Sequence, residues 1–175
     1  MTDTDVKQLV WELYKQMANK GYPVKPIHDI RINDSISCFG MCTLLKAFNY
    51  NKVVITISHM SVASGYDKLR NTIIHELCHA CCPINENHGR VWQSYAERAS
   101  IDFHTSITTT DKLNKSAEKW LAKQYKYTVI CDYCGCTYQY MRKTKFVKQC
   151  LEGHTQYICA ECKHDSFTVK VLDND

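Results

Sequence analysis

The sequence has no long apolar run, and no stretch approaches the roughly 20 apolar residues that are needed to cross a bilayer. Its first residues, Met1-Thr2-Asp3-Thr4-Asp5, also lack the basic and apolar regions of a signal peptide. Disorder is not indicated either, because 45% of the residues are hydrophobic and 23% are charged, as in ordinary globular proteins. We therefore expect a folded, intracellular protein of the cytoplasm with no membrane partner.

A disulfide framework is not expected, although the chain has 11 cysteines. The count is odd, and an intracellular setting keeps thiols reduced, so paired thiolates on a metal explain the cysteines better. At 175 residues the chain can bury one substantial core and hold a small second module that is stabilised by other means.

The most informative stretch is His75-Glu76-Leu77-Cys78-His79. Apolar residues at helical spacing predict a helix over residues 67–81. On a helix, His75 and His79 share one face and can bind one zinc ion through neutral nitrogen atoms. Zinc lowers the pKa of a bound water to about 7, so Glu76 can act as the general base. The implied reaction is hydrolysis of a peptide bond.

A catalytic zinc site needs a third protein ligand and one open position. His88 is the candidate, because Pro83 stops the helix and lets the chain turn back. Glu86 in the same loop and Glu97 on a following helix are the alternatives. The presence of a third ligand candidate disfavours an ordinary amphipathic helix with two exposed histidines.

The run from His75 to Ala80, followed by His88-Gly89-x-x-Trp92 and a downstream module with paired cysteines, resembles the SprT-like family. This family includes the Spartan proteases, which degrade proteins crosslinked to DNA. The metzincin pattern, with a glycine and a third histidine soon after the second, is absent. The likeness covers roughly residues 5–170. It implies a zinc-dependent, DNA-stimulated protease with little sequence preference in its protein substrate.

Apolar spacing predicts further helices over residues 5–19, 89–100 and 111–124. The candidate caps of the first and last of these helices are Asp3, Thr4 and Asp111. Alternation predicts a strand at residues 30–32, and the β-branched run of residues 53–58 predicts another. Residues 53–58 could form an edge strand that pairs with the substrate backbone, or a central strand that does not touch it.

A second metal-site pattern consists of two Cys-x-x-Cys pairs, Cys131/Cys134 and Cys159/Cys162, with 24 residues between them. Four thiolates hold a closed, tetrahedral structural zinc. We expect residues 138–146 and 157–158 to supply short antiparallel strands of a zinc ribbon. Cys136 is an alternative to Cys134, although the glycine after Cys134 fits a metal knuckle better. A module this small and poor in apolar residues needs the metal for its folding energy.

Residues 112–148 are basic, with nine lysines and arginines against two acidic residues. The nine are Lys112, Lys115, Lys119, Lys123, Lys126, Arg142, Lys143, Lys145 and Lys148. The aromatic residues of the second module are Tyr133, Tyr138, Tyr140 and Phe146. Rings that stack on bases, beside cations that neutralise phosphates, would suit single-stranded DNA. The alternative is that the rings form the core of the module and the lysines a solvated face.

Together these features predict an α+β fold with a zincin-like metalloprotease domain over residues 1–108 and a basic helix plus four-cysteine zinc ribbon over residues 109–175. We expect one catalytic zinc, bound by His75, His79 and His88 with Glu76 as base. We expect one structural zinc, bound by Cys131, Cys134, Cys159 and Cys162. The partners would be protein substrates and DNA, single-stranded or crosslinked to protein. The alternatives are a nucleic-acid-binding zinc protein without protease activity and a zinc hydrolase that acts on substrates other than peptides.

Overall fold

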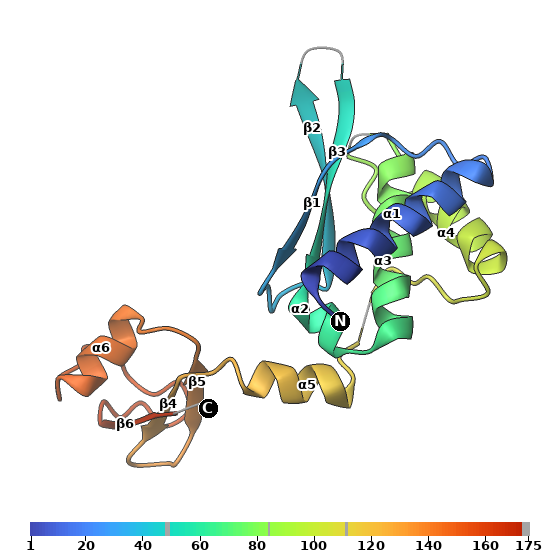
Figure 1. Cartoon of the computed structure of the whole chain (residues 1–175). Helices are drawn as coiled ribbons and strands as arrows, with labels where there is room; N and C mark the ends of the chain where they lie inside the picture. Colours follow the sequence, from blue (N-terminus) through green and yellow to red (C-terminus); the bar gives the residue numbers. More distant parts are fainter. Residues whose placement is uncertain (48–49, 84, 111, 173–175) are drawn as a thin grey trace. The chain divides into compact units, whose positions relative to one another are not determined.

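The computed structural model describes residues 1–47, 50–83, 85–110 and 112–172, which form a mixture of helices and strands (Figure 1). The elements are α1 (Asp3–Asn19), β1 (Ile27–Asn33), β2 (Gly40–Ala47), β3 (Tyr50–Ser58), α2 (His59–Ala63), α3 (Tyr66–Cys81), α4 (Arg90–Asp102), α5 (Lys115–Ala122), β4 (Tyr127–Cys131), β5 (Thr137–Tyr140), α6 (Lys145–Leu151) and β6 (Phe167–Val171). The expected mixture of helix and strand is confirmed at this level. The zincin-like class and the zinc ribbon stay predictions.

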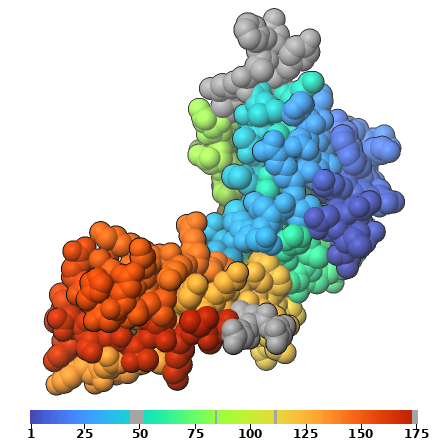
Figure 2. All heavy atoms as spheres, turned by 60° about the vertical axis from the view of Figure 1, so that its left-hand side comes forward, coloured from blue at the N-terminus to red at the C-terminus, as the bar shows by residue number. Residues whose placement is uncertain are grey.

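The chain divides into two compact units, Met1–Glu118 and Lys119–Asp175. Figure 2 draws the heavy atoms of both units, with the first in blue to yellow and most of the second in orange to red. The domain limits expected from the sequence, 1–108 and 109–175, stay a prediction. Within the described residues, no helix is both long enough and apolar enough to cross a membrane.

The first unit is built on a three-stranded sheet in the order β1-β3-β2. β1 runs parallel to β3, and β2 runs antiparallel to it. Helices α1 and α3 lie beside the sheet, and α4 packs against α3 (Figure 1). Val53, Ile55 and Ile57 of β3 are completely buried in the core that these helices share.

Helix α1 confirms the apolar spacing read from residues 5–19, because Val6, Val10 and Met17 are fully buried. Its cap is different from the expected Asp3 or Thr4. Thr2 Oγ1 accepts a hydrogen bond from the Asp5 amide, and the Asp5 carboxylate accepts one from the Thr2 amide. This reciprocal capping box begins the helix two residues earlier than predicted.

Residues 53–58 lie in the central strand β3, so the expectation that they form the substrate-pairing edge was wrong. β3 is hydrogen-bonded to β1 on one side and to β2 on the other. A continuous β-branched run is typical of a strand buried on both faces. Because β3 is paired on both sides, it has no free edge. Among the described residues β2 pairs only with β3, which leaves β2 as an open edge beside α3.

The second unit contains an antiparallel sheet in the order β5-β4-β6. The expected strand over residues 138–146 is shorter, because β5 ends at Tyr140 and Thr144 caps helix α6 by accepting a hydrogen bond from the Val147 amide. Residues 157–158 are not in a strand, and β6 takes the place expected for them. The proposed cap Asp111 lies outside the described residues; Asn114 Oδ1 accepts from the Ala117 amide at the start of α5.

Candidate metal centres

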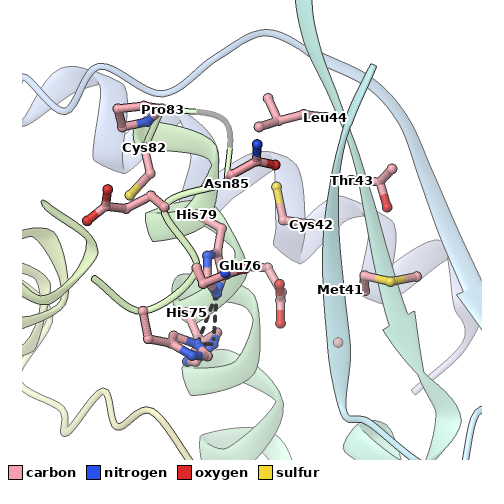
Figure 3. Close-up of a pocket in the computed structure, with 14 residues that line it drawn as sticks. Met41, Cys42, Thr43, Leu44, His75, Glu76, His79, Cys82, Pro83 and Asn85 are labelled. Atoms are coloured by element: carbon pink, nitrogen blue, oxygen red, sulfur yellow. Dashed lines mark hydrogen bonds between the residues drawn. The ribbon is translucent and has the colours of Figure 1, made fainter. Parts of the chain in front are cut away.

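Helix α3 places His75, Glu76 and His79 at the edge of a hollow of about 810 Å³ (Figure 3). The opposite face of α3 carries Leu69, Ile73 and Leu77 into the core, where each is at most 1% exposed. The apolar stripe therefore fixes the rotation of the helix. This rotation brings the two imidazoles to the surface of the hollow.

His88 reaches the same point from the loop between α3 and α4. Its Nε2 lies 3.0 Å from His75 Nε2 and 3.1 Å from His79 Nε2, and the latter two atoms are 3.3 Å apart. Three nitrogens at about 2.0–2.1 Å from one tetrahedral ion would lie about 3.3 Å from one another. The three residues thus fit a zinc ion with an open fourth position.

The protonation of the imidazoles also suits metal binding. His75 Nδ1 donates a hydrogen bond to the Thr108 carbonyl at 3.0 Å, which leaves the lone pair of its Nε2 for a ligand bond. Burial, with the nearby His75 and His88, lowers the pKa of His79 to about 4. Burial also lowers the pKa of His88. Both imidazoles are therefore neutral at neutral pH, the form that binds zinc.

Trp92 of α4 underlies all three histidines. Its ring centroid lies 4.7 Å from that of His75, 5.4 Å from that of His79 and 4.4 Å from that of His88. The side chain is 1% exposed, as expected for a core anchor. The sequence did not predict that this anchor would be the floor of the site. The one sequence feature that links Trp92 to the site is its position four residues after His88.

Glu76 projects from α3 toward β2, beside the histidines (Figure 3). It is only 6% exposed. A Cβ atom added to Gly40 would lie 2.9 Å from both Cγ and Oε1 of Glu76. The absence of a side chain at Gly40 therefore gives the carboxylate its place at the edge of the sheet.

The two alternative third ligands have other positions. Glu86 Oε1 accepts a hydrogen bond from the Val91 amide at 2.9 Å and so caps the start of α4. Glu97 is an exposed residue of α4. Neither belongs to the ligand group formed by the three histidines.

The cysteines near the histidines are buried thiols. Burial raises the pKa of Cys81 to about 12 and that of Cys82 to about 11. Both thiols therefore stay protonated at neutral pH. Neither is in a ligand group within the described residues.

The second group lies in the C-terminal unit, where the ligand atoms of Cys131, Cys134, Cys159 and Cys162 are all within 4.8 Å of one another. Cys131 Sγ is 3.5 Å from Cys162 Sγ, and Cys134 Sγ is 3.6 Å from Cys159 Sγ. Four sulfurs at about 2.3 Å from a tetrahedral zinc would lie about 3.8 Å apart. The group fits zinc, and Cys136 is not part of it.

The two knuckles share one backbone geometry. Gly135 and Lys163, each directly after the second cysteine of a pair, have φ angles of 72° and 65°. Their amides donate to the carbonyls of Cys131 and Cys159, the first cysteines of the pairs. The Tyr138 hydroxyl lies 3.3 Å from Cys159 Sγ. This hydrogen bond is the main reason that the pKa of Cys159 falls to about 6, which favours the thiolate.

A sequence profile of the SprT-like family matches residues 8–111, more than half of the chain. The chain belongs to the SprT-like family. The match spans α3, all three histidines and Trp92, and it ends before the cysteine pairs of the second unit.

Two relatives of this SprT-like chain carry the same name, germ cell nuclear acidic protein. The one from Drosophila melanogaster is 35% identical over 98 residues, which are 54% of this chain and 9% of the relative. The one from Homo sapiens is 24% identical over 184 aligned residues, which are 98% of this chain and 24% of the relative. The chain therefore spans no more than about a quarter of the length of these relatives.

The four aromatic rings expected to bind DNA differ in their exposure to solvent. Tyr138, Tyr140 and Phe146 pack around the small core of Val129, Val147 and Cys150. Tyr133 is 70% exposed and stacks on His164, with ring centroids 3.6 Å apart and planes inclined by 12°. All nine basic side chains of residues 112–148 are exposed. The alternative of a structural core thus applies to three of the four rings.

Proposed function

We propose that this SprT-like chain is a zinc-dependent endopeptidase that cleaves proteins bound or crosslinked to DNA. The observation that carries the proposal is the meeting of three Nε2 atoms within 3.3 Å of one another beside a buried carboxylate. A purely structural site of three histidines would have no need of Glu76 at that place.

Zinc in this site would supply Lewis acidity toward a water molecule and the carbonyl of the cleaved bond. Glu76 would take the proton of the attacking water and pass it to the departing amine. The carbonyl of Thr108 holds His75 in the tautomer whose Nε2 atom can bind zinc. Trp92 excludes water from the inner side of the three imidazoles.

The open edge of β2 is the proposed place for the substrate backbone. Met41, Cys42, Thr43 and Leu44 line the hollow opposite His79 (Figure 3). A substrate added as a further strand would be held by main-chain hydrogen bonds, which read no side chains. Such binding agrees with a broad choice of protein substrates.

The peptidase proposal is tested by Glu76→Gln in the full-length chain. The amide keeps the size of the side chain but cannot act as a base, so cleavage of an unfolded protein should fall at least a hundredfold while zinc content stays the same. Normal cleavage by this variant would exclude the stated mechanism.

DNA is the proposed recruiting partner, and the exposed basic residues with the stacked pair of Tyr133 and His164 support this role. Cations neutralise phosphates and release counterions, and exposed rings stack on unpaired bases. The four-thiolate zinc would be structural and would hold this surface in shape.

Reversing the charge at Lys143 and Lys145 tests the DNA surface. The double variant Lys143→Glu/Lys145→Glu should bind single-stranded DNA more weakly. The plot of the logarithm of its binding constant against the logarithm of salt concentration should become shallower, by about 0.7 in slope for each lost phosphate contact. The control is Lys7→Glu/Lys15→Glu, which makes the same charge change at exposed positions of α1. Equal DNA affinity of the two double variants would place the DNA site elsewhere.

A further inference from the structure

A second hollow, of about 410 Å³, adjoins the histidine site on the side of α2. It shares Gly40, His75, Glu76 and His88 with the larger hollow, so the metal site lies where the two hollows meet. Its volume falls within the range of about 300–1,000 Å³ that is usual for ligand pockets. Because both hollows are lined by His75, Glu76 and His88, a peptide cleaved at the histidine site would extend into both.

The two hollows have different chemistry. Beyond the histidines, the larger one is bordered by Asn85, Glu86 and Asn87 of the loop after α3 and, on the other side, by residues 41–44 of β2. The smaller one is bordered by four large apolar side chains, Ile36, Phe39, Met60 and Leu113, with the smaller side chains of Ser37, Cys38, Thr72 and Thr109 between them. This difference gives the two sides of the cleaved bond different surroundings.

The apolar walls consist of a buried floor and an exposed rim. Met60 and Phe39 are 2% and 9% exposed, whereas Ile36 and Leu113 are 39% and 43% exposed. Met60 is unbranched and can adapt to side chains of different shape. Two exposed aliphatic side chains that face one hollow are a surface that an apolar group could cover.

The direction of β2 determines which substrate residue reaches this hollow. β2 starts at Gly40, next to Glu76, and runs along the larger hollow toward Leu44. We take the substrate strand to pair antiparallel with β2, because antiparallel pairing is the more stable mode, so the substrate runs the opposite way. Its residue after the cleaved bond would therefore lie near residues 36–40, at the smaller hollow.

We propose that the smaller hollow is a subsite for a large aliphatic or aromatic side chain on the residue that follows the cleaved bond. The proposal rests on the peptidase function proposed above. Pairing with the backbone of β2 does not select among substrate side chains, and the subsite adds a preference at one position. Ile36 and Leu113 are the specificity-determining residues, because they form the accessible rim.

Binding of two hydroxamates to the zinc-loaded full-length chain tests the subsite without turnover. Acetohydroxamate and 4-methylpentanohydroxamate share one zinc-binding group and differ only by an added isobutyl group. Burial of that group should make the larger compound bind about tenfold more tightly in calorimetric titration. The variant Ile36→Ser/Leu113→Ser should lose most of this gain.

The matched control is Met41→Ser, which removes a similarly exposed apolar side chain (49%) from β2, outside the smaller hollow. It should keep the tenfold difference between the two hydroxamates. Equal affinities in the wild type, or an unchanged difference in the Ile36→Ser/Leu113→Ser variant, would overturn the subsite.

Sequencing the ends of cleavage products by mass spectrometry separates this proposal from the peptidase proposal. Wild-type products should be enriched in Leu, Ile, Met or Phe at the new N-terminus, and the double variant should lose the enrichment. Glu76-dependent cleavage without that enrichment would overturn the subsite and leave the peptidase. Discrimination between the hydroxamates without any Glu76-dependent cleavage would show an apolar pocket beside the metal site but would overturn the peptidase and, with it, the role given to this pocket.

Discussion

At the scale of single residues, the site depends on close contacts that leave little room for change. Gly40 is the clearest case, because an added Cβ would press on both Glu76 and Thr72 Cγ2 at 2.9 Å. Thr72 is itself buried and fixed on α3, so the carboxylate would have to give way. The position of Glu76, the proposed general base, therefore depends on the absence of a side chain at Gly40 of the edge strand.

Gly40→Ala should accordingly lower kcat by about tenfold to a hundredfold, since a misplacement of about 1 Å at a catalytic group has effects of that size. Zinc content should not change, because the alanine is adjacent to Glu76 and not to a proposed ligand. Steady-state kinetics and metal analysis on the same preparation measure both quantities. Thr43→Ala, on the exposed side of the same strand, is the control, and a wild-type kcat for Gly40→Ala would show that the carboxylate does not need this space.

His59 gives a pH-dependent prediction that is separate from the metal sites. Its Nδ1 lies 2.6 Å from Asp34 Oδ1 and its Nε2 lies 3.0 Å from Asp3 Oδ1. These two bonds, that to Asp3 first, raise the pKa of His59. The charged form is therefore favoured in the folded state, where it links α1, the loop after β1 and the start of α2.

Because the pKa is raised on folding, this stabilisation is fully present below the unfolded pKa of 6.5 and is lost as the pH rises through the higher folded value. His59→Gln should destabilise the chain by less than about 1 kcal/mol at pH 5.5, since the side chains are partly exposed. The difference should shrink by pH 8.5. Denaturant unfolding of both zinc-saturated proteins measures it, and a difference that grows with pH would have the wrong sign.

At the scale of elements, residues 85–89 and the start of α4 together position His88. Glu86 caps α4 at the Val91 amide, and Gln93 Nε2 donates to the His88 carbonyl at 3.0 Å. Gly89 has no side chain, which leaves room for the Glu86 carboxylate. The hydrogen bonds of Glu86 and Gln93 thus fix the start of α4 and the position of His88, the third proposed ligand, together.

Removing the cap by Glu86→Ala should destabilise the first unit by about 1 kcal/mol, as is typical for a lost helix cap. It should also weaken zinc binding, because His88 loses its fixed place. Competition with a chromogenic chelator measures zinc affinity in the full-length chain. Glu97→Ala, on an exposed face of the same helix, should change neither quantity, and a loss of zinc in this control would reopen Glu97 as a ligand.

The elements that the sequence predicted best are those with a strong local signal. Helices α1, α3 and α4 follow from apolar spacing, and β3 follows from a β-branched run. The order of strands depends on contacts between distant segments, so periodicity placed residues 53–58 in a strand but could not show that this strand is central. Helix α6 was missed because Tyr138, Tyr140 and Phe146 were interpreted as one strand, whereas Thr144 begins a helix between them.

The candidate ligands could be named from spacing, because His-Glu-x-x-His and Cys-x-x-Cys place side chains through local geometry alone. Their supports could not. The carbonyl of Thr108, the space at Gly40 and the hydroxyl of Tyr138 come from segments far away in the chain. A single sequence does not show which backbone carbonyl, which glycine or which hydroxyl will lie beside a given ligand.

At the scale of the whole molecule, we expect the two units to depend on metal to different degrees. The first has a large apolar core, whereas the core cluster of the second consists of Val129, Val147 and Cys150, with partly buried rings around them. So small a core contributes little folding free energy without a metal. Zinc removal should therefore affect the second unit far more than the first.

Cys131→Ser should expose this difference. Hydrogen exchange measured by mass spectrometry should show lost protection in β4, β5 and β6 and unchanged protection in α1 and α3. Cys136→Ser, outside the four-thiol group, should keep the wild-type pattern. A fully protected sheet in Cys131→Ser would show that the second unit folds without the four-thiolate site.

The most direct measurement is cleavage of a DNA-binding protein by wild type and Glu76→Gln, with and without single-stranded DNA, with zinc per chain determined on the same samples. We predict two zinc ions per chain in both proteins, and cleavage by the wild type alone that single-stranded DNA increases. Two zinc ions with tight DNA binding and no cleavage under any condition would contradict the peptidase proposal and favour a nucleic-acid-binding zinc protein.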